Sequence, residues 1–270
     1  MATPLFQVDA FTNRKFKGNP AAVCLLTKPA DESWMQTVAA EMNLSETAFV
    51  CPHEDPFKRA WRLRWFTPAV EVDLCGHATL ATTHVLFTQG YLKPTDKAEF
   101  HTKSGILTCT RDESAWITMD FPAKLEEEAA APDGLLEGLG INQSDVVYIG
   151  RNQFDYLVEV TSAETIRTLQ PNHHLLSQID IRGTMVTSHS DSDEFDFISR
   201  FFAPGSGIPE DPVTGSAHCC LTPYWASKLN KTEMTAYQAS PRGGTLRLKL
   251  NGDRVELRGQ AVTILRGKLL

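Results

Sequence analysis

Glu46 stands where a carboxylate can carry a proton. It lies in the stretch 44–50, which is predicted to be extended, and strand alternation places it on one face with Leu44, Ala48 and Val50. A carboxylate among apolar side chains loses hydration, so its pKa rises and it becomes a general acid or base usable near neutral pH. The alternative is an edge strand that leaves Glu46 in solvent, and the residues alone favour this alternative.

Two glycines, Gly76 and Gly215, precede mostly apolar stretches at 80–87 and 219–229 that are predicted to be helical. At a helix N-terminus, free backbone N–H groups and the helix dipole favour an anion, and a glycine lets the ligand approach the backbone closely. A tight turn explains either glycine alone, but the matched pair favours anion binding. Ser216 adds a hydroxyl to such a site, and His77 adds a donor if it is protonated. The two segments are Cys75-Gly76-His77-Ala78 and Thr214-Gly215-Ser216-Ala217.

These segments belong to an internal repeat that relates the two halves of the chain. Phe66-Thr67-Pro68 precedes the first segment, and Phe202-Ala203-Pro204 precedes the second. A helix too apolar for a protein surface follows in each half, which predicts two similar domains, each with a sheet wrapped around one buried helix. Two such domains are expected to leave a cleft between them, with two helix N-termini available to face it.

Short extended stretches dominate the rest of the chain. One helix is predicted to begin after Asp31, and Thr161-x-x-Glu164 resembles a capping box that opens a second, short helix. Asn251-Gly252 predicts a hairpin with a type I′ turn. Strands that follow one another so closely indicate mostly antiparallel sheets with few helices, hence an α+β fold. The predicted strands are 6–10, 21–26, 44–50, 62–66, 98–102, 106–111, 116–121, 146–150, 154–160, 184–188, 195–202, 246–250 and 255–257.

The stretch 124–134 marks the expected boundary between the two domains. It is small and charged, lacks a hydrophobic period, and lies close to the midpoint of the chain. Such a stretch is typical of a solvated connection. The predicted domains are therefore residues 1–122 and 123–270.

Composition excludes several classes of protein and partner. Of 270 residues, 42% are hydrophobic, and 26 basic against 33 acidic side chains give a net charge of −7. This profile excludes disordered and fibrous proteins, and nucleic acid is not expected as a partner because no basic excess is present to hold a phosphate backbone. The uncharged run 74–92 contains too many threonines and histidines for a membrane span, so no membrane association is expected.

Cysteine and histidine spacing predicts neither zinc sites nor a redox motif. The six cysteines include no C-x-x-C pair, and the eight histidines include no H-E-x-x-H pattern. No metal is therefore expected, and His173-His174 is predicted to lie in a surface loop. Because the N-terminal residues do not resemble a secretory signal, reduced thiols and a cytoplasmic location are expected.

Four longer motifs occur in order along nearly the whole chain. They are Gly18-Asn19-Pro20-Ala-Ala-Val, Asn43-Leu-Ser-Glu46-Thr-Ala-Phe, Phe66-Thr-Pro-x-x-Glu71-Val-x-Leu-Cys75-Gly76-His77-Ala-Thr and Phe202-Ala-Pro-x-x-Gly207-x-x-Glu210-Asp211-Pro-Val-Thr-Gly215-Ser216-Ala-His. With these motifs the sequence resembles the phenazine-biosynthesis PhzF-like family. It looks most similar to the phenazine-biosynthesis-like domain proteins of animals and plants.

The resemblance implies a fold, a site and a reaction. The fold is diaminopimelate-epimerase-like, with two domains whose sheets each curl around a central helix, and the final strand, at about 260–270, returns to the first domain. The active site lies between the domains, and members work without cofactor or metal, often as homodimers. The phenazine-making members move a proton between carbons of a hydroxy acid. Their catalytic glutamate, histidine and aspartate match Glu46, His77 and Asp211, and their serine matches Ser216.

One position departs from the epimerases that share this fold. Diaminopimelate epimerases use two opposed cysteines, one before the glycine of each helix start; here Cys75 holds the first place and Thr214 the second. The sequence therefore predicts a cofactor-independent isomerase for a small anionic carboxylate, with Gly76, Gly215, Ser216 and Cys75 on the substrate. An amino-acid racemase or epimerase, and a non-catalytic interaction protein on the same fold, are the alternatives. By residue type alone, Asp211 can equally be a turn residue and His77 a helix-cap histidine.

Overall fold

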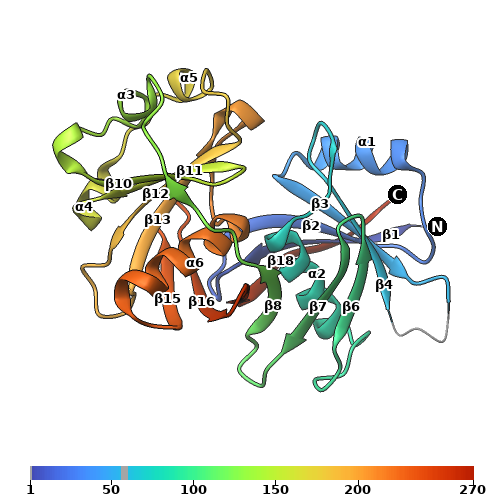
Figure 1. The fold of residues 1–270 in the computed structure, drawn as a ribbon. Helices are drawn as coiled ribbons and strands as arrows, with labels where there is room; N and C mark the ends of the chain where they lie inside the picture. Colours follow the sequence, from blue (N-terminus) through green and yellow to red (C-terminus); the bar gives the residue numbers. More distant parts are fainter. Residues whose placement is uncertain (1, 56–59) are drawn as a thin grey trace. The chain divides into compact units, whose positions relative to one another are not determined.

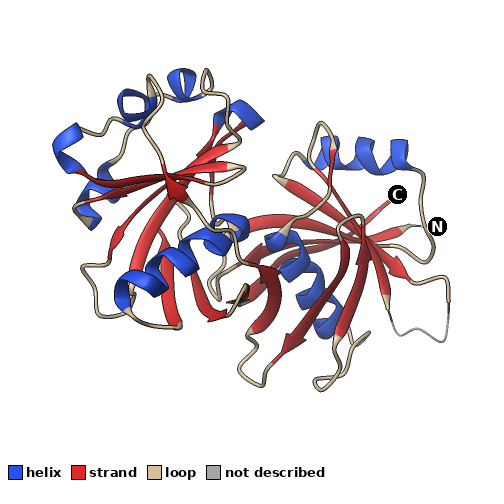
Figure 2. Ribbon diagram, viewed as in Figure 1, coloured by secondary structure: helices blue, strands red, loops and turns tan. Residues whose placement is uncertain are grey.

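The computed structural model describes residues 2–55 and 60–270, which form two compact units (Figure 1). Unit 1 comprises Met1–Asp120 and Arg258–Leu270, and unit 2 comprises Phe121–Leu257. The chain therefore passes into unit 2 after Asp120 and returns to unit 1 at Arg258. In both units a few helices lie among many strands (Figure 2), which confirms the predicted α+β class.

Unit 1 is a mixed, mostly antiparallel sheet with two longer helices. Its elements are β1 (Thr3–Ala10), β2 (Asn19–Leu25), α1 (Glu32–Met42), β3 (Glu46–Pro52), β4 (Trp61–Phe66), β5 (Glu71–Val72), α2 (Gly76–Thr88), β6 (Ala98–Thr102), β7 (Gly105–Arg111), β8 (Ile117–Pro122, which runs on into unit 2) and β18 (Ala261–Leu269). β1 lies between β2 and β18 and is antiparallel to both. β2 is parallel to β3, and β4 is antiparallel to β3 and parallel to β6. β7 is antiparallel to β6 and β8.

The helix α2 forms the core of unit 1. Its residues 77–83 and 85–87 are buried, and it contacts β1, β2, β3 and β18. Three buried threonines in α2 donate their hydroxyls to the carbonyl four residues earlier: Thr79 to Cys75 at 2.6 Å, Thr82 to Ala78 at 2.7 Å and Thr83 to Thr79 at 2.8 Å. Because these hydroxyls are satisfied within the helix, the threonines that exclude a membrane span do not prevent burial in a protein core.

Unit 2 repeats this plan with more short helices. Its elements are β9 (Glu127–Glu128), α3 (Leu135–Leu139), the 3₁₀ turn η1 (Gln143–Asp145), β10 (Val146–Arg151), β11 (Asp155–Val160), α4 (Ala163–Thr168), α5 (His173–Leu176), β12 (Gly183–His189), β13 (Phe197–Ala203), η2 (Pro204–Ser206), β14 (Ile208–Asp211), α6 (Gly215–Leu229), β15 (Glu233–Gln238), β16 (Gly244–Asn251) and β17 (Arg254–Gly259, which runs on into unit 1). β11 is antiparallel to β10 and parallel to β12, and β13 is antiparallel to β12 and parallel to β15.

The strand order of the two units is the same. β10 to β16 pair with one another as β1 to β7 do, and β9 lies beside β10 as β18 lies beside β1. The helix α6 is the counterpart of α2: residues 217–226 of α6 are buried, and it contacts β15 and β16. The predicted pair of similar folds, each built around one buried helix, is therefore confirmed.

The repeat extends to a partly buried arginine–glutamate pair in each unit, which the motifs did not predict. The guanidinium of Arg64 binds Glu71, with Nε 2.6 Å from Oε1, and that of Arg200 binds Glu210, with Nε 2.7 Å from Oε1. Each guanidinium also lies over the ring of the phenylalanine two residues later, at 5.1 and 5.0 Å from the ring centre. These matched contacts tie β4 to β5 and β13 to β14, the short strands that lead to α2 and α6.

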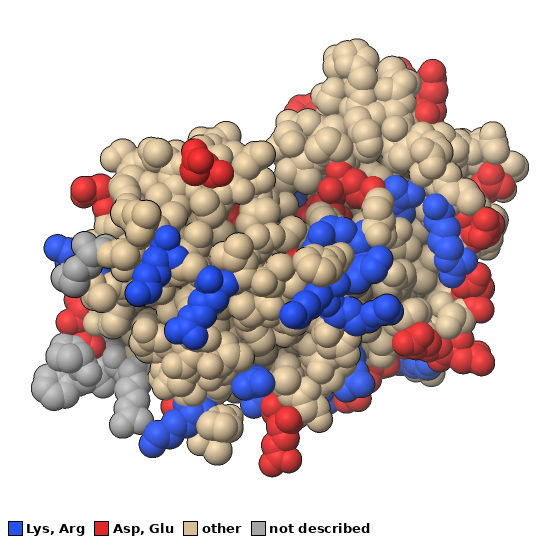
Figure 3. Space-filling view, turned by 180° about the vertical axis from the view of Figure 1, so that it is seen from behind, with Lys and Arg blue, Asp and Glu red and all other residues tan. Residues whose placement is uncertain are grey.

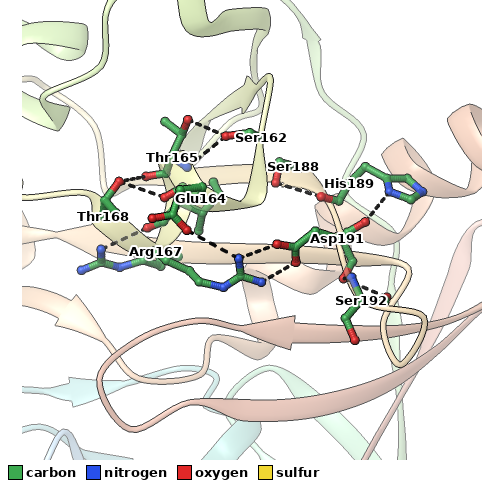
Figure 4. A network of polar contacts seen from close by, with 12 residues as sticks. Ser162, Glu164, Thr165, Arg167, Thr168, Ser188, His189, Asp191 and Ser192 are labelled. Atoms are coloured by element: carbon green, nitrogen blue, oxygen red, sulfur yellow. Dashed lines mark hydrogen bonds and ion pairs between the residues drawn. The ribbon is translucent and has the colours of Figure 1, made fainter.

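The helix α4 begins one residue later than the capping box predicted. Its N-cap is Ser162, whose Oγ accepts a hydrogen bond from the backbone N–H of Thr165 at 3.1 Å (Figure 4). Thr161 is therefore not the cap, and the predicted box is wrong. At the other end of the helix, Arg167 donates to Asp191 at 2.7 Å, so a cation stands near the helix C-terminus, where the dipole favours it.

Two further local predictions differ from the structure. β16 ends at Asn251 and β17 begins at Arg254, so the turn consists of Gly252 and Asp253, with φ 61° at Gly252. The predicted type I′ turn at Asn251-Gly252 is therefore wrong: the turn lies one residue later, and of its two residues only Gly252 has a positive φ, whereas type I′ needs a positive φ at both. His173, predicted in a surface loop, begins the short helix α5, which Asn172 caps through the backbone N–H of Leu175 at 3.2 Å.

Charged side chains cluster on the surface, whereas the cysteines are buried. Lys and Arg side chains gather in part of the face drawn in Figure 3, with acidic side chains around them. Within the described part of the chain, no helix is long and apolar enough to cross a membrane. All six cysteines lie in the described residues, where they are buried and form no disulfide, and burial raises the pKa of Cys24, Cys109 and Cys220 to about 12. These three thiols are therefore protonated and unreactive near neutral pH.

Candidate active site

Glu46 is the first residue of β3 and lies inside the sheet. In the parallel pairing it stands opposite Ala21 of β2, and the next residue, Thr47, pairs with Phe66 of β4. The Glu46 side chain is 12% exposed. The alternative of an edge strand with Glu46 in solvent is therefore wrong. Residues 47–51 are all buried, so both faces of the strand are covered, which alternation alone does not predict.

His77, the second residue of α2, lies directly against Glu46. Its Nε2 is 3.2 Å from Oε2 of Glu46, and its side chain is 6% exposed. Its other ring nitrogen, Nδ1, is 3.5 Å from Sγ of Cys75, the N-cap residue of α2. Three of the predicted site residues are thus brought together in unit 1, with the imidazole between the carboxylate and the thiol.

The imidazole of His77 is neutral. Desolvation by burial lowers its pKa from the usual 6.5 to about 3. The condition under which His77 adds a cationic donor to an anion site, a protonated ring, is therefore not met at neutral pH. A neutral imidazole has one N–H donor and one acceptor nitrogen. The contact of Nδ1 with Sγ is a hydrogen bond, whereas the contact of Nε2 with Oε2 is a close approach without hydrogen-bond geometry.

The same three residues are of types that bind metal ions. One ligand atom from each of Glu46, Cys75 and His77 lies within 4.8 Å of the other two. The close contacts of His77, however, use Nδ1 toward the thiol and Nε2 toward the carboxylate. A single ion binds only one nitrogen of a ring, so an ion held by all three residues would have to replace one of these two contacts.

Asp211, the last residue of β14, is tied to the start of α6 in unit 2. Its Oδ2 accepts a hydrogen bond from the hydroxyl of Thr214 at 2.5 Å. Thr214 is the N-cap residue of α6, and its backbone N–H donates to Oε1 of Gln238 at 2.8 Å, while Nε2 of Gln238 donates to the Asp211 carbonyl at 2.7 Å. Asp211 therefore helps to hold the loop that leads into α6.

Gly215 and Ser216 open α6 beside an arginine that the motifs did not indicate. Nη1 of Arg182 donates to Oγ of Ser216 at 3.2 Å. The same guanidinium is held by the buried carboxylate of Asp155, with Nε 2.8 Å from Oδ1. Arg182 is 39% exposed on its side chain whereas Asp155 is 1% exposed. A positive charge of fixed orientation thus lies next to the predicted anion-binding serine.

A signal for Arg182 was present in the repeat. Gly183 stands opposite Asp155 in the parallel pair β11–β12, as Glu46 stands opposite Ala21 in β2–β3. Aligning the two halves on these strands, rather than on the glycine segments alone, places Gly183 at the position of Glu46 and Arg182 directly before it. Unit 2 therefore carries a cation next to the position at which unit 1 carries its carboxylate.

Neither buried helix is capped by the side chain that precedes it. The N-cap residues Cys75 and Thr214 have extended backbones and make no side-chain cap hydrogen bond to α2 or α6. Gly76 and Gly215 are the first helical residues in each case. This arrangement is compatible with the predicted use of the first-turn N–H groups for an anion.

The chain belongs to the phenazine biosynthesis-like (PhzC-PhzF) protein family, whose profile matches residues 8–267. It is 56% identical to an uncharacterized isomerase of Halalkalibacterium halodurans, over 100% of this chain and 99% of the relative. It is 41% identical to the human phenazine biosynthesis-like domain-containing protein, with the same coverage. The bacterial relative is thus closer than the human one, which corrects the expected greater likeness to animal proteins.

Solved structures show the same fold. A PhzF-family crystal structure from Enterococcus faecalis matches with a TM-score of 0.92 and 40% identity, covering 100% of both chains. A hydroxyproline epimerase from Agrobacterium vitis matches with a TM-score of 0.65 and 11% identity, covering 99% of this chain and 92% of the epimerase. The second likeness is one of fold, and it confirms the predicted epimerase-like architecture.

Proposed function

We propose that this protein is a cofactor-independent isomerase that moves a proton between two carbons of a small carboxylate, with Glu46 as the proton carrier. The observation that carries the proposal is the contact between Oε2 of Glu46 and Nε2 of His77 at 3.2 Å in a nearly buried setting. The isomerase name of the 56% identical relative supports the reaction class.

In the proposed reaction, Glu46 is base and then acid. Its carboxylate takes a proton from one carbon of the substrate, the C–H electron pair enters the conjugated system of the substrate, and the same carboxyl returns a proton to a second carbon. The net change is the shift of one hydrogen and one double bond, so no electron acceptor is needed. The imidazole of His77, with Nε2 3.2 Å from Oε2, lies against the carboxyl and limits its movement, as a positioned acid or base requires.

The negative charge that develops in such a reaction needs donors close to it. The backbone N–H groups that begin with Gly76 and Gly215, and the hydroxyl of Ser216, are the proposed donors for the carboxylate and the developing charge. Arg182 orients Ser216 by donating to its oxygen, which leaves the hydroxyl proton of the serine for the ligand. We assign Asp211 the task of holding Thr214 and the loop into α6.

A racemase or epimerase with two thiols is the second candidate, and the structure disfavours it. At the position of the second cysteine stands Thr214, whose hydroxyl donates to Asp211 at 2.5 Å. A hydroxyl committed to a carboxylate is a poor substitute for a thiol as carbon acid or base. A one-base epimerase that uses Glu46 is distinguished from an isomerase only by its product. The expected interdomain cleft, homodimer and cytoplasmic location remain predictions from the sequence.

The experiment that tests the proposal is a ligand screen followed by product analysis. Small carboxylic acids are screened for a rise in the temperature of unfolding, because a ligand that binds only the folded state stabilises it by mass action. Each hit is then incubated with the protein and followed by NMR. Conversion to a constitutional isomer supports the proposal, conversion to a stereoisomer supports the epimerase, and binding without conversion supports the non-catalytic alternative.

A further inference from the structure

Cys75 is the member of the buried cluster to which the proposed reaction gives no step. The residue is 6% exposed, and its Sγ lies 3.5 Å from Nδ1 of His77. The other nitrogen of that ring, Nε2, lies 3.2 Å from Oε2 of Glu46. The ring of His77 therefore faces the thiol with one nitrogen and the carboxylate with the other, and one ligand atom of each residue lies within 4.8 Å of the other two.

The chemistry of the thiol and the carboxylate decides which nitrogen carries the hydrogen. In the proposed reaction Glu46 starts as an ionised carboxylate, which presents only lone pairs to Nε2 at 3.2 Å. This favours the hydrogen of the neutral ring on Nε2. Nδ1 then presents a lone pair toward Cys75, and the weak S–H donor of the thiol fits this lone pair. Both neighbours therefore favour the tautomer with the hydrogen on Nε2.

We infer that Cys75 is a positioning residue that holds His77 in the Nε2–H tautomer, so that a proton taken up by Glu46 stays on Glu46. This inference rests on the proposed role of Glu46. Once Glu46 has removed a proton from the substrate, it is a carboxylic acid that can donate as well as accept. If the ring carried its hydrogen on Nδ1, Nε2 would accept the new proton and withdraw it from the reaction. With Nε2–H in place, Nε2 has no lone pair, and the proton remains available for the second carbon.

A second buried histidine, His218 in α6 of unit 2, provides a reference with the opposite tautomer. Nδ1 of His218 lies 2.8 Å from the carbonyl oxygen of Thr214. A carbonyl oxygen only accepts, so His218 carries its hydrogen on Nδ1. Burial lowers the pKa of His218 to about 4, so both rings are neutral near pH 7. The protein thus contains one buried neutral histidine of each tautomer.

The test is ¹⁵N NMR of the full chain labelled in its histidines, at pH 7, where the two ring nitrogens of a neutral imidazole give distinct signals. In the unsubstituted protein, His77 is expected as Nε2–H and His218 as Nδ1–H. Glu46→Gln removes the influence of the carboxylate, because an amide can turn to donate or to accept. In that variant Cys75 alone decides the tautomer, and His77 is expected to remain Nε2–H.

Two double variants complete the experiment. Glu46→Gln with Cys75→Ala is expected to lose the single tautomer and show a mixture, whereas Glu46→Gln with Cys75→Ser, which keeps a hydroxyl donor, is expected to restore Nε2–H. The His218 signal is the control and stays unchanged throughout. Nδ1–H at His77 in the unsubstituted protein, a mixture in Glu46→Gln alone, or an unchanged Nε2–H in the alanine double variant overturns the inference. The readout needs no turnover, so these outcomes leave the proposed isomerase activity standing or falling on its own test.

Discussion

Nε2 of His77 lies 3.2 Å from Oε2 of Glu46, and the two side chains are 6% and 12% exposed. Unit 1 contains a second pair of the same types, His101 and Glu99, with Nε2 3.0 Å from Oε1, but there the side chains are 25% and 41% exposed. The pairs have nearly the same separation and differ in burial. Burial sets the two pairs apart, because desolvation lowers the pKa of the His77 ring to about 3.

This difference makes Glu99→Gln a matched control for Glu46→Gln. We expect Glu46→Gln to lower turnover of any substrate found by about two to four orders of magnitude, because the amide keeps the shape but cannot exchange a proton. Glu99→Gln should leave turnover unchanged. Rate measurements on both variants under saturating substrate check this. Comparable turnover by Glu46→Gln and Glu99→Gln would remove Glu46 from the catalytic role.

Stability should fall when the pH is lowered from 7 to 5.5. Burial lowers the pKa of His77 to about 3 and of His218 to about 4. The unfolded chain binds protons at these rings near pH 6.5, and the folded chain does not, so acid favours unfolding. Each ring contributes a loss of about 1 kcal/mol over this interval. Urea unfolding at both pH values measures it; equal stability at the two values contradicts the burial of neutral imidazoles.

The two matched arginine–glutamate pairs should differ in their effect on stability. Arg200 is 9% exposed and also donates to the carbonyls of Ile166 and Leu169 at 3.2 and 2.9 Å. Arg200→Met therefore leaves Glu210 and two carbonyls without their donor, and we expect a loss of about 3–5 kcal/mol.

Arg64→Met is the comparison for this pair. Arg64 is 30% exposed, and its partner Glu71 keeps a contact with Lys103 after the substitution. We expect a loss of about 1–2 kcal/mol. Urea unfolding of both variants gives the values, and a larger loss for Arg64→Met than for Arg200→Met contradicts the ranking by burial.

Ser216→Ala should weaken the binding of small anions while leaving the fold intact. The hydroxyl is oriented by Arg182 at 3.2 Å, and a hydrogen bond to a charged group contributes about 1.5–3 kcal/mol, which corresponds to a loss of affinity of about tenfold or more. Calorimetric titration with citrate measures the effect. Ser104→Ala, whose hydroxyl donates to the Asp73 carbonyl at 2.6 Å, is the control; equal citrate affinity in both variants would count against an anion site at α6.

The sequence predicted the repeated architecture because that architecture depends on local patterns of apolar and turn residues. Apolar runs after Gly76 and Gly215 indicate the two buried helices, and closely spaced strands indicate the sheets. The motif around Gly18 could also be found in the sequence, but the reason why this position requires glycine could not. Gly18 has φ +65°, and a Cβ there would lie 2.1 Å from the carbonyl oxygen of Ala10. The need for glycine thus comes from a close approach of two backbone segments, which only the folded chain shows.

The site was predicted less completely because its polar partners are distant in sequence. Arg182 and Asp155 are separated by the helices α4 and α5 and their connecting loops, and no spacing rule connects them to Ser216. The neutral state of His77 follows from burial that the sequence suggests but does not fix. Where two candidates are adjacent, as with Thr161 and Ser162, local rules place the cap only to within a residue.

Deuterium labelling of the substrate is the most direct test of Glu46 as the proton carrier. A carboxylate found by the ligand screen is prepared with deuterium on the carbon that loses its hydrogen, and its conversion in ordinary water is followed by NMR. If Glu46 carries the proton, deuterium leaves that carbon in every turnover, appears on the second carbon or in the solvent, and is not released by Glu46→Gln. Product that still carries deuterium on the original carbon contradicts the account.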